Sequence, residues 1–283
     1  MTETAIRPVP SFADLRQLAN SSPVARACIQ LRKQEIRYAD WDIGLTGGAC
    51  KRCSPARGAE ARVFFRRPEP DYGSLPAWLD AALEDVLVTD SLAIYVRKAR
   101  EGSKGLLGSD VHSLELIDGA TLAPSCDSHG CAGPVLQYLS EVRRCGVTEM
   151  IAGGSVPAGS LHHHASYGRH EVLYRPYCLR AGNAFGFSPL EQAIAWKDGS
   201  GEIDLARTEA RMPEAFGLDP ADLGLAPVKD ADPILAPLNP ANLREWVKSI
   251  FDGILHDTCD APDLEFLWLP AEGGLPSDDV LSV

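Results

Sequence analysis

The sequence predicts an α+β fold in which short helices and short strands are mixed along one N-terminal region. Three helix starts, at Ser22-Pro23, Ser188-Pro189 and Asn239-Pro240, place a capping residue directly before a proline at the first helical position. Short apolar or alternating runs lie between these starts and are typical of strands. The 21 prolines and 25 glycines predict short elements joined by much irregular chain.

The first elements are expected in the order arm, helix, helix, strand and loop. Their ranges are 1–11, 12–19, a helix opening at Ser22-Pro23, 36–45, and a Gly/Cys/Arg-rich loop at 46–61. The apolar periodicity of the second helix predicts a buried face made of Val24, Ala27, Cys28 and Leu31.

A strongly amphipathic helix opens at Ser74-Leu75-Pro76. Its apolar stripe is predicted to consist of Trp78, Ala82, Leu83, Val86 and Leu87. A strand at 91–97, a turn at 101–105 and a partner near 114–117 predict a hairpin. Further short strands are expected near 121–122, 135–139 and 171–174, whereas residues 145–168 lack periodicity and predict a mobile loop.

The segment Arg169–Ala193 is the most informative part of the chain. A short apolar strand at Val172–Tyr174 runs through a turn-rich link into Ser188-Pro189-Leu190-Glu191. Serine as the cap, proline at the first helical position and glutamate near the positive end of the helix dipole predict a helix at 188–197. Beyond it we expect a helix at 203–211, little regular structure at 212–238, a helix from Asn239-Pro240 and a strand at 264–269.

Charge is distributed unevenly along the chain. The net charge is −12, and residues 1–200 contain 22 residues of each sign. Residues 201–283 hold 17 acids against five bases, so this end carries the whole net charge. Such a surface is unlike one that grips phosphates. It suits either a solvated acidic segment that aids solubility or a wall that nucleic acid passes without sticking.

Composition also indicates the compartment and the state of the cysteines. Residues 1–10 have no apolar core of signal-peptide length, and no apolar run is long enough to span a bilayer, which predicts a protein made in a cytoplasm. The eight cysteines are therefore expected to be reduced. Cys50-x-x-Cys53 and the pair Cys126 and Cys131 each offer half a zinc site, without a second pair at the spacing of a finger or ribbon.

Two glycine-containing motifs fail as catalytic signatures. The run Gly102–Ser109 lacks the Gly-Lys-Ser/Thr end of a phosphate-binding loop. Gly186-Phe-Ser188-Pro-Leu190 begins like a nucleophile elbow but has leucine in place of the closing glycine. We therefore interpret Ser188 as a helix cap and expect no catalytic residue and no cofactor.

One histidine cluster keeps an enzymatic alternative open. His162, His163, His164 and His170 form the best metal-like group in the sequence. His170-Glu171 opens like a zinc-protease helix, but Tyr174 stands where the second histidine is needed. An exposed polar loop is favoured, so no metal is predicted, and a metal-dependent hydrolase remains the alternative from another class.

Read in order, several motifs resemble the portal, or head-to-tail connector, proteins of tailed double-stranded-DNA bacteriophages. The matching segments are Val24–Arg37 with Trp41-Asp42-Ile43; Ala82–Arg97 with Asp90, Ala93, Tyr95 and Arg97; Leu114–Pro124 before the turn Asp127–Gly130; Met212–Phe216; and Leu267–Pro270. In the Arg169–Ala193 segment the matching residues are Tyr174, Pro176, Arg180, Gly186, Ser188, Pro189 and Glu191. The resemblance covers about residues 12–272.

The resemblance implies a structural subunit without enzymatic activity. It implies a wing-like α+β domain at 12–187, the start of a helical stem at 188–211 and a clip-like acidic region at 212–283, with the Tyr174–Glu191 motif joining wing to stem. It also implies a dodecameric ring at the capsid vertex of a virion, assembled in the host bacterial cytoplasm. Its partners would be the terminase large subunit, the major capsid protein and a head-tail adaptor, with double-stranded DNA passing through and no membrane contact.

The chain departs from the family pattern in two places. Family members continue with a second long stem helix, further wing and a crown, whereas this chain stops at Val283, which suggests a truncated or degenerate copy. The loop at 145–168 is also longer and richer in histidine than the family pattern. A monomeric adaptor that forms no ring is therefore a further alternative.

Overall fold

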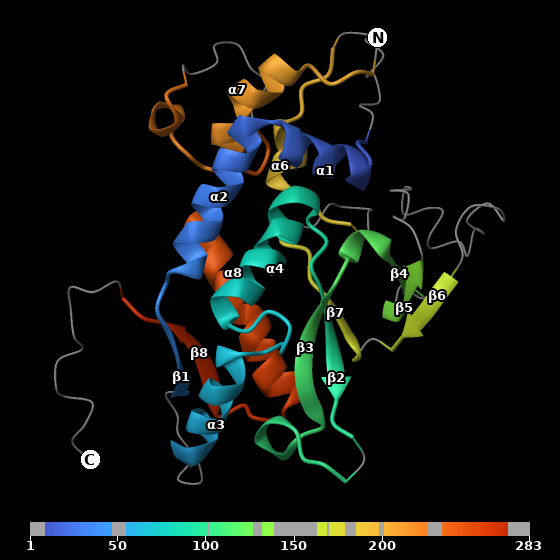
Figure 1. Ribbon diagram of the computed structural model, residues 1–283, viewed down its shortest axis with the longest axis vertical. Coiled ribbons are helices and arrows are strands. Elements are labelled where there is room, and N and C mark those ends of the chain that lie inside the picture. Colours follow the sequence, from blue (N-terminus) through green and yellow to red (C-terminus); the bar gives the residue numbers. More distant parts are fainter. Residues whose placement is uncertain are drawn as a thin grey trace. The chain divides into compact units, whose positions relative to one another are not determined.

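The computed structural model describes residues 9–46, 55–100, 102–126, 132–138, 163–168, 170–178, 185–197, 201–225 and 234–270. Helices and strands are mixed along the chain, so the predicted α+β class is confirmed (Figure 1). The chain divides into two compact units. The first comprises Met1–Lys33, Asp80–Val96 and Glu115–Pro240, and the second comprises Gln34–Leu79, Arg97–Leu114 and Ala241–Val283. Within the described ranges no helix combines the length and apolarity needed to cross a membrane.

The helices include short 3₁₀ turns and one π turn. They are α1 (Phe12–Ser21), α2 (Pro23–Arg37), α3 (Pro55–Arg66), α4 (Leu75–Thr89), η1 (Leu106–Gly108), η2 (Gly119–Thr121), α6 (Pro189–Ala193), α7 (Leu205–Ala215), η3 (Pro220–Leu223), α8 (Pro240–Gly253) and the π turn η4 (Ile254–Thr258). The strands are β1 (Trp41–Leu45), β2 (Ala93–Lys98), β3 (Val111–Ile117), β4 (Leu122–Cys126), β5 (Ala132–Tyr138), β6 (His163–Tyr167), β7 (Val172–Tyr174) and β8 (Leu264–Trp268).

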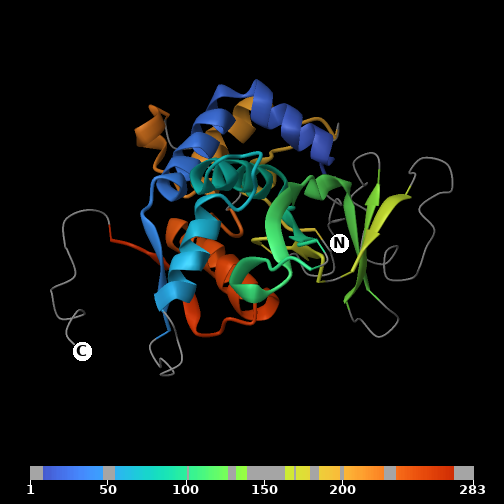
Figure 2. The same cartoon turned by 60° about the horizontal axis from the view of Figure 1, so that its bottom comes forward.

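The described strands form three small sheets. Their orders are β1-β8, β3-β2-β7 and β4-β5-β6. The pairs β1–β8, β2–β7, β4–β5 and β5–β6 are antiparallel, and the register of β2 with β7 sets Ala93 opposite Tyr174. Strands β4, β5 and β6, coloured green to yellow in Figure 2, form a hydrogen-bonded sheet of their own. Leu122 of β4 and Val135 of β5 nevertheless share a buried cluster with Ala93 of β2 and Val172 of β7.

Local sequence explains why the first unit's helices begin where they do. Ser11 and Asp14 form a reciprocal capping box at the start of α1, in which each side chain accepts from the other's backbone N–H.

The predicted stripe of α4 is confirmed, since all five of its side chains are buried. Phe12 from α1 and Phe185 meet edge to face with ring centroids 5.4 Å apart, and both pack against Ala120.

The second unit has an aromatic core between α3, α8 and the β1–β8 ribbon. Phe251 of α8 contacts Phe65 of α3 edge to face at 5.1 Å and stacks on Phe266 of β8 at 4.6 Å. Trp41 of β1 stacks on the same Phe266 ring at 5.6 Å. Aromatic pairs of this kind add to the stabilisation from apolar burial, which makes this cluster the centre of the unit.

Side chains occupy the outer edges of the β1–β8 ribbon. The Ile43 N–H donates to the Asp42 carboxylate at 2.8 Å, and Arg62 donates to the Ile43 carbonyl at 3.3 Å. On β8, the Phe266 N–H donates to the Asp252 carboxylate at 2.7 Å. These backbone groups are thus already satisfied, which disfavours pairing of a further strand at these positions.

Several predicted elements are corrected by the structure. The loop expected at 46–61 contains the first half of α3, because Gly58, Ala61 and Phe65 give this helix a narrow buried face of mostly small residues. The strand expected at 36–45 begins only at Trp41, since α2 continues to Arg37. Residues 163–167 of the predicted mobile loop form β6, and residues 145–162 lie outside the described ranges.

The predicted face of α2 is correct only at Cys28. The buried positions are Ala25, Cys28, Ile29, Arg32, Lys33 and Ile36. Arg32 and Lys33 are buried because carbonyl and carboxylate groups surround their charges, a contact that apolar periodicity does not detect.

Candidate functional site: the joint after helix α4

Asp90 directly follows α4 and has a left-handed backbone conformation. Its φ angle is +49°, a region that aspartate and asparagine enter at less cost than most other residues. Its N–H still donates to the Val86 carbonyl at 3.1 Å, which completes the last turn of the helix. The left-handed residue therefore ends α4 and turns the chain toward β2.

The Asp90 carboxylate collects backbone donors from a distant part of the chain. It accepts from the N–H of Tyr177 at 2.5 Å, of Cys178 at 2.8 Å and of Phe187 at 3.0 Å. Asp90 is 0% exposed, so these bonds satisfy a charge that would otherwise be costly to bury. One side chain thereby fixes both ends of the segment between β7 and α6.

Two glycines allow the backbone to approach this carboxylate and the residue after it. A Cβ atom at Gly186 would lie 1.9 Å from the Asp90 Oδ2. A Cβ atom at Gly119 would lie 1.5 Å from the Ser91 carbonyl oxygen. Neither position has room for a side chain, so glycine is required at both by close packing.

Ser188 binds the end of α4 and the start of α6 at the same time. Its hydroxyl donates to the Val88 carbonyl at 2.8 Å and accepts from the Glu191 N–H at 3.1 Å. The predicted cap is confirmed, with Pro189 at the first helical position. We call the assembly of Asp90, Gly119, Gly186 and Ser188, with the backbone they contact, the joint.

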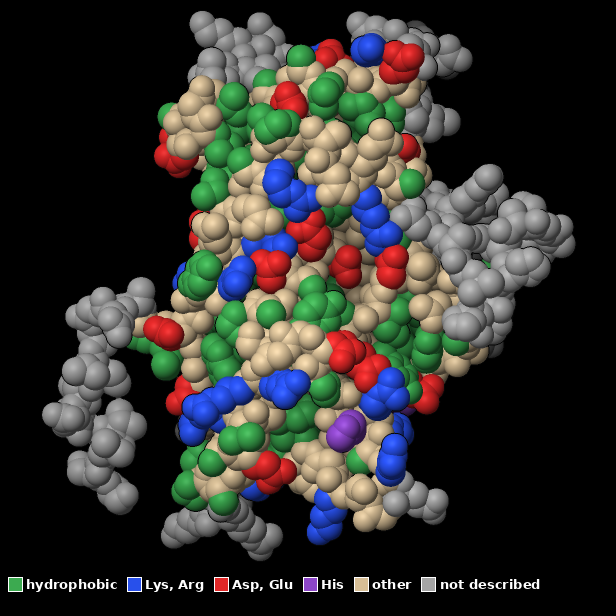
Figure 3. Space-filling model, viewed as in Figure 1, with side chains coloured by type: hydrophobic (Ala, Val, Ile, Leu, Met, Phe, Trp, Pro, Cys, Tyr) green, Lys and Arg blue, Asp and Glu red, His purple; other side chains and the backbone are tan. Residues whose placement is uncertain are grey.

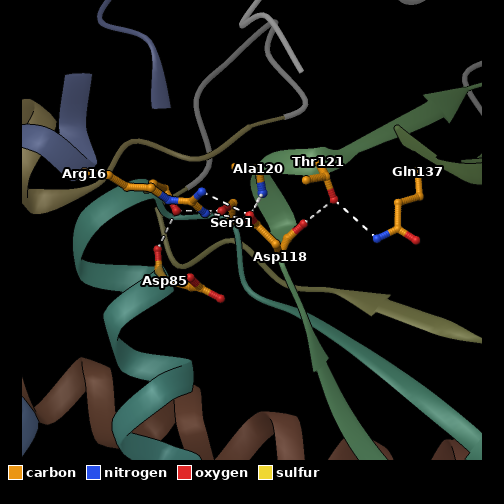
Figure 4. A network of polar contacts seen from close by, with 8 residues as sticks. Arg16, Asp85, Ser91, Asp118, Ala120, Thr121 and Gln137 are labelled. Carbon is orange, nitrogen blue, oxygen red and sulfur yellow. Dashed lines mark hydrogen bonds and ion pairs between the residues drawn. The ribbon is translucent and has the colours of Figure 1, made fainter. Parts of the chain in front are cut away.

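Helix α1 is tied to the joint by an ion pair. The two terminal guanidinium nitrogens of Arg16, Nη1 and Nη2, both donate to the carboxylate of Asp118, the residue before Gly119 (Figure 4). Asp118 also caps η2 by accepting from the Ala120 N–H at 3.0 Å. Its carbonyl accepts from the Thr121 hydroxyl at 2.7 Å. Asp118 therefore links α1, η2 and the start of β4.

Helix α7 is held by buried polar contacts to the residues that directly follow α6. The Thr208 hydroxyl accepts from the Ala195 N–H at 3.0 Å, and Arg211 donates to the Ile194 carbonyl at 3.2 Å. Arg32 of α2, 4% exposed, donates from Nε to the Phe216 carbonyl at 2.7 Å and from a second nitrogen to the Gly217 carbonyl. Arg32 thus satisfies carbonyls left open at the C-terminal end of α7.

The face over α2 and α4 carries interleaved charges (Figure 3). Lys33, with a side chain 5% exposed, pairs with Asp80 at 2.8 Å and with Glu84 at 2.9 Å. Arg26 also pairs with Glu84, at 2.7 Å. The contacts fasten α2 along α4, the helix that carries Asp90.

The structure brings most of the predicted motif residues into one place. Gly186, Ser188, Pro189 and Glu191 belong to the joint or to α6, and Tyr174 pairs with Ala93 just beyond it. Pro176 lies between β7 and the Asp90 contacts, whereas Arg180 lies outside the described residues. The helix predicted at 188–197 ends at Ala193, because the chain turns into a bridge between Trp196 and Ile203.

Sequence reasoning misses the two basic residues that hold the joint's neighbouring helices. Arg32 and Lys33 are adjacent on α2 and both are buried, yet a charged pair on a helix ordinarily predicts a solvated face. The sequence marks Asp90 only as part of a motif. The one sequence signal for its role at the end of α4 is its position as an acidic residue directly after the strong apolar stripe, where the helix has to end.

The histidine alternative gains no described site. His162 lies outside the described residues, and of His163 and His164 only the backbone, in β6, is described. His170 is exposed in the turn before β7. Among the described residues no group of three or more His, Cys, Asp or Glu could hold a metal ion.

No protein-family model matches the sequence, and no curated protein matches it. Solved structures with a similar chain include "Neck of empty GTA particle computed with C6 symmetry", at 11% identity and a TM-score of 0.48 over 94% of this chain. A second is "Virion of native gene transfer agent (GTA) particle", at 11% identity and a TM-score of 0.46 over 94% of this chain. A third is "Neck of native GTA particle computed with C12 symmetry", at 12% identity and a TM-score of 0.44 over 96% of this chain. This chain spans 64%, 63% and 65% of those chains, respectively.

Proposed function

We propose that this chain is a structural subunit of a portal-like ring in a tailed-phage-like particle. The observation that carries the proposal is the convergence of three portal-like motifs at the joint. They lie around Asp90, around Gly119 and over Tyr174–Glu191, separated along the chain, and they contact one another through Asp90–Phe187, Ser188–Val88 and Gly119–Ser91. Segments that matched the family independently by chance would not be expected to contact one another in the folded chain.

The joint uses its motif residues for backbone contacts rather than for reaction chemistry. Asp90 accepts from backbone N–H groups, Ser188 is occupied as a cap and the two glycines provide space. The Ser188 hydroxyl donates to the buried Val88 carbonyl, whereas an activated nucleophile donates to a base. These roles favour a scaffold that assembles over an enzyme.

The proposed mechanism is passive. In this scheme residues 12–187 supply the wing, 188–211 begin the stem and 212–283 supply clip material, and the joint connects wing to stem. Acidic side chains of the 201–283 region would repel duplex DNA in the channel and keep phosphate contacts few. A terminase would supply the energy, and the capsid and a head-tail adaptor would hold the ring in the virion.

Mass photometry and negative-stain electron microscopy of the purified chain test the proposal. We expect closed rings whose mass is a multiple of the 30.5 kDa subunit. A second measurement, anisotropy of labelled duplex DNA at rising salt, should show weak binding. A chain that stays monomeric at every concentration overturns the ring and favours the adaptor, and tight duplex binding overturns the acidic channel wall.

A further inference from the structure

Basic residues are concentrated in one part of the second compact unit, although the chain as a whole is acidic. Residues 55–67 and 97–112 hold eight bases and three acids, whereas the net charge of the chain is −12. Figure 3 shows basic side chains over α3 and over the turn that joins β2 to β3, in the lower part of the view. Six exposed residues of these elements define what we call the basic surface: Arg66, Arg67, Arg97, Lys98, Arg100 and Lys104.

The fold holds the two elements of the basic surface together. The carboxylate of Glu60 in α3 accepts from the N–H of Leu107, in the turn between β2 and β3, at 2.6 Å. The carbonyl of Pro68, just after α3, accepts from the Leu114 N–H of β3 at 2.8 Å. These bonds fix the backbone on both sides of the surface before any partner binds, which lowers the entropy cost of binding.

Much of this positive charge is not neutralised by nearby acids. Lys98 pairs with Asp110 at 3.0 Å, in a contact where both side chains are 58% exposed. The side chains of Arg66, Arg100 and Lys104 have no acidic partner within the part of the chain that the structure describes. Because like charges on one surface repel one another, an acidic partner gains direct attraction and also relieves this repulsion.

The first compact unit carries the opposite charge along α7 and η3. Residues 201–225 hold six acids and two bases, and one of the two bases, Arg211, is buried. The exposed acids of this segment define what we call the acidic surface: Glu202, Glu214, Asp219 and Asp222. One chain therefore presents two surfaces of opposite sign, each on a different compact unit.

Each of the two surfaces also exposes a large apolar side chain beside its charges. Val63 lies one turn before Arg66 and Arg67 on the surface of α3 and is 67% exposed. Leu205 opens α7, three residues after Glu202, and is 48% exposed. Protein interfaces combine an apolar centre with a polar rim, so the two surfaces match in apolar content as well as in charge.

We propose that the basic surface of one subunit binds the acidic surface of a second copy of this chain. The inference rests on the proposed ring, because identical subunits joined head to tail need two different, complementary surfaces on each subunit. Contacts between opposite charges select the partner and its orientation more than they add affinity. The contact uses only acids of residues 201–225, so the acids that follow remain for the proposed channel wall.

Two charge-reversed triple variants test the contact by mass photometry. The first carries Arg66→Glu, Arg100→Glu and Lys104→Glu, and the second carries Glu202→Lys, Glu214→Lys and Asp222→Lys. We expect each variant alone to associate at least about tenfold more weakly than the unaltered chain. An equimolar mixture of the two should assemble again, because opposite signs then face each other at every contact. The matched control has the same change in charge as the first variant, at exposed bases outside the basic surface, and should assemble like the unaltered chain: Arg175→Glu, Arg207→Glu and Arg244→Glu.

A salt titration of the unaltered chain covers the case in which a triple variant does not fold. Association should weaken between about 0.05 and about 0.5 M sodium chloride, because salt screens exposed charges. Rings that ignore salt, or a mixture of the two variants that does not assemble, overturn this contact and leave the ring standing. A chain that stays monomeric overturns the ring and this contact together. If the first variant loses binding of labelled duplex DNA but keeps its self-association, the basic surface serves nucleic acid and the second copy is overturned as its partner.

Discussion

Gly186 lies against Asp90 so closely that a Cβ atom at residue 186 would be 1.9 Å from the Asp90 carboxylate and 2.8 Å from its carbonyl oxygen. The contact joins residues 96 positions apart in the sequence, and the carboxylate concerned accepts the N–H of the residue that follows the glycine. The fit of the joint therefore depends on the absence of one side chain and the presence of another.

Gly186→Ala should destabilise the chain by about 3 kcal/mol, because the methyl group must displace the Asp90 carboxylate from its three donors. Urea denaturation followed by circular dichroism measures the change. Gly58→Ala is the matched control, since a Cβ there meets its nearest atom at 3.8 Å inside helix α3. The control should gain about 0.5–1 kcal/mol from helix propensity. An equal response of the two variants would contradict the close approach.

Asp90→Asn should cost about 2–4 kcal/mol, because an amide offers one acceptor atom where the carboxylate serves three N–H groups with two. Asp90→Ala should cost more, since it also loses the tolerance of the left-handed backbone. Asp110→Asn removes a surface pair with Lys98 in which both side chains are 58% exposed, and should change stability by less than about 0.5 kcal/mol. A loss at Asp90 no larger than at Asp110 would refute its role in the joint.

Ser188→Ala should cost about 1–2 kcal/mol, because the α6 cap is lost and the Val88 carbonyl loses its donor in a buried site. Ser188→Thr keeps a hydroxyl and should recover part of this loss. Thermal denaturation of the three proteins gives the order, with the unaltered chain first, threonine second and alanine last. Alanine as stable as serine would mean that the cap contributes nothing.

The elements that sequence predicts well are those whose stability comes from their own pattern. Helix α4 follows from its apolar stripe, and the start of α6 follows from serine, proline and glutamate in order. The end of α6 does not, because it depends on the Ala195–Thr208 hydrogen bond and the Trp196–Ile203 bridge, which join it to chain further on. Such contacts leave no local signal.

Helix α3 and the buried side of α2 could not be read from periodicity for a related reason. The buried side of α3 includes Gly58 and Ala61, which look like loop residues beside several arginines. On α2 the buried Arg32 is satisfied by carbonyls of a helix end about 184 residues later in the chain. The joint itself was predictable as a set of motifs, but the contacts between them required the fold.

Arg32→Lys tests whether the end of α7 needs a forked donor. An ammonium group has no rigid fork to serve the Phe216 and Gly217 carbonyls together, so we expect a cost of about 1–2 kcal/mol, with Arg32→Ala costing more. Arg207→Lys, at an exposed position of α7, is the matched control and should be neutral. Urea denaturation measures both. Equal values for Arg32→Lys and the control would show that the fork is dispensable.

Cys28 and Cys259 should resist alkylation in the folded protein at pH 8. Burial raises the pKa of the Cys28 thiol to about 12, against the lowering effect of Arg32. Burial also raises the pKa of Cys259 to about 11, although a hydrogen bond from Ser109 favours the thiolate. Because only the thiolate reacts and both groups stay protonated, we expect labelling by iodoacetamide at least about a hundredfold slower than in guanidinium chloride. Peptide mass spectrometry resolves each site, and the partly exposed Cys178 is the internal control that should react in the folded chain.

Cys28 and Cys259 lie in different compact units, so each reports the packing of its own unit. Rapid labelling of Cys28 alone would contradict the buried face of α2, and rapid labelling of Cys259 alone would contradict the packing at the end of η4.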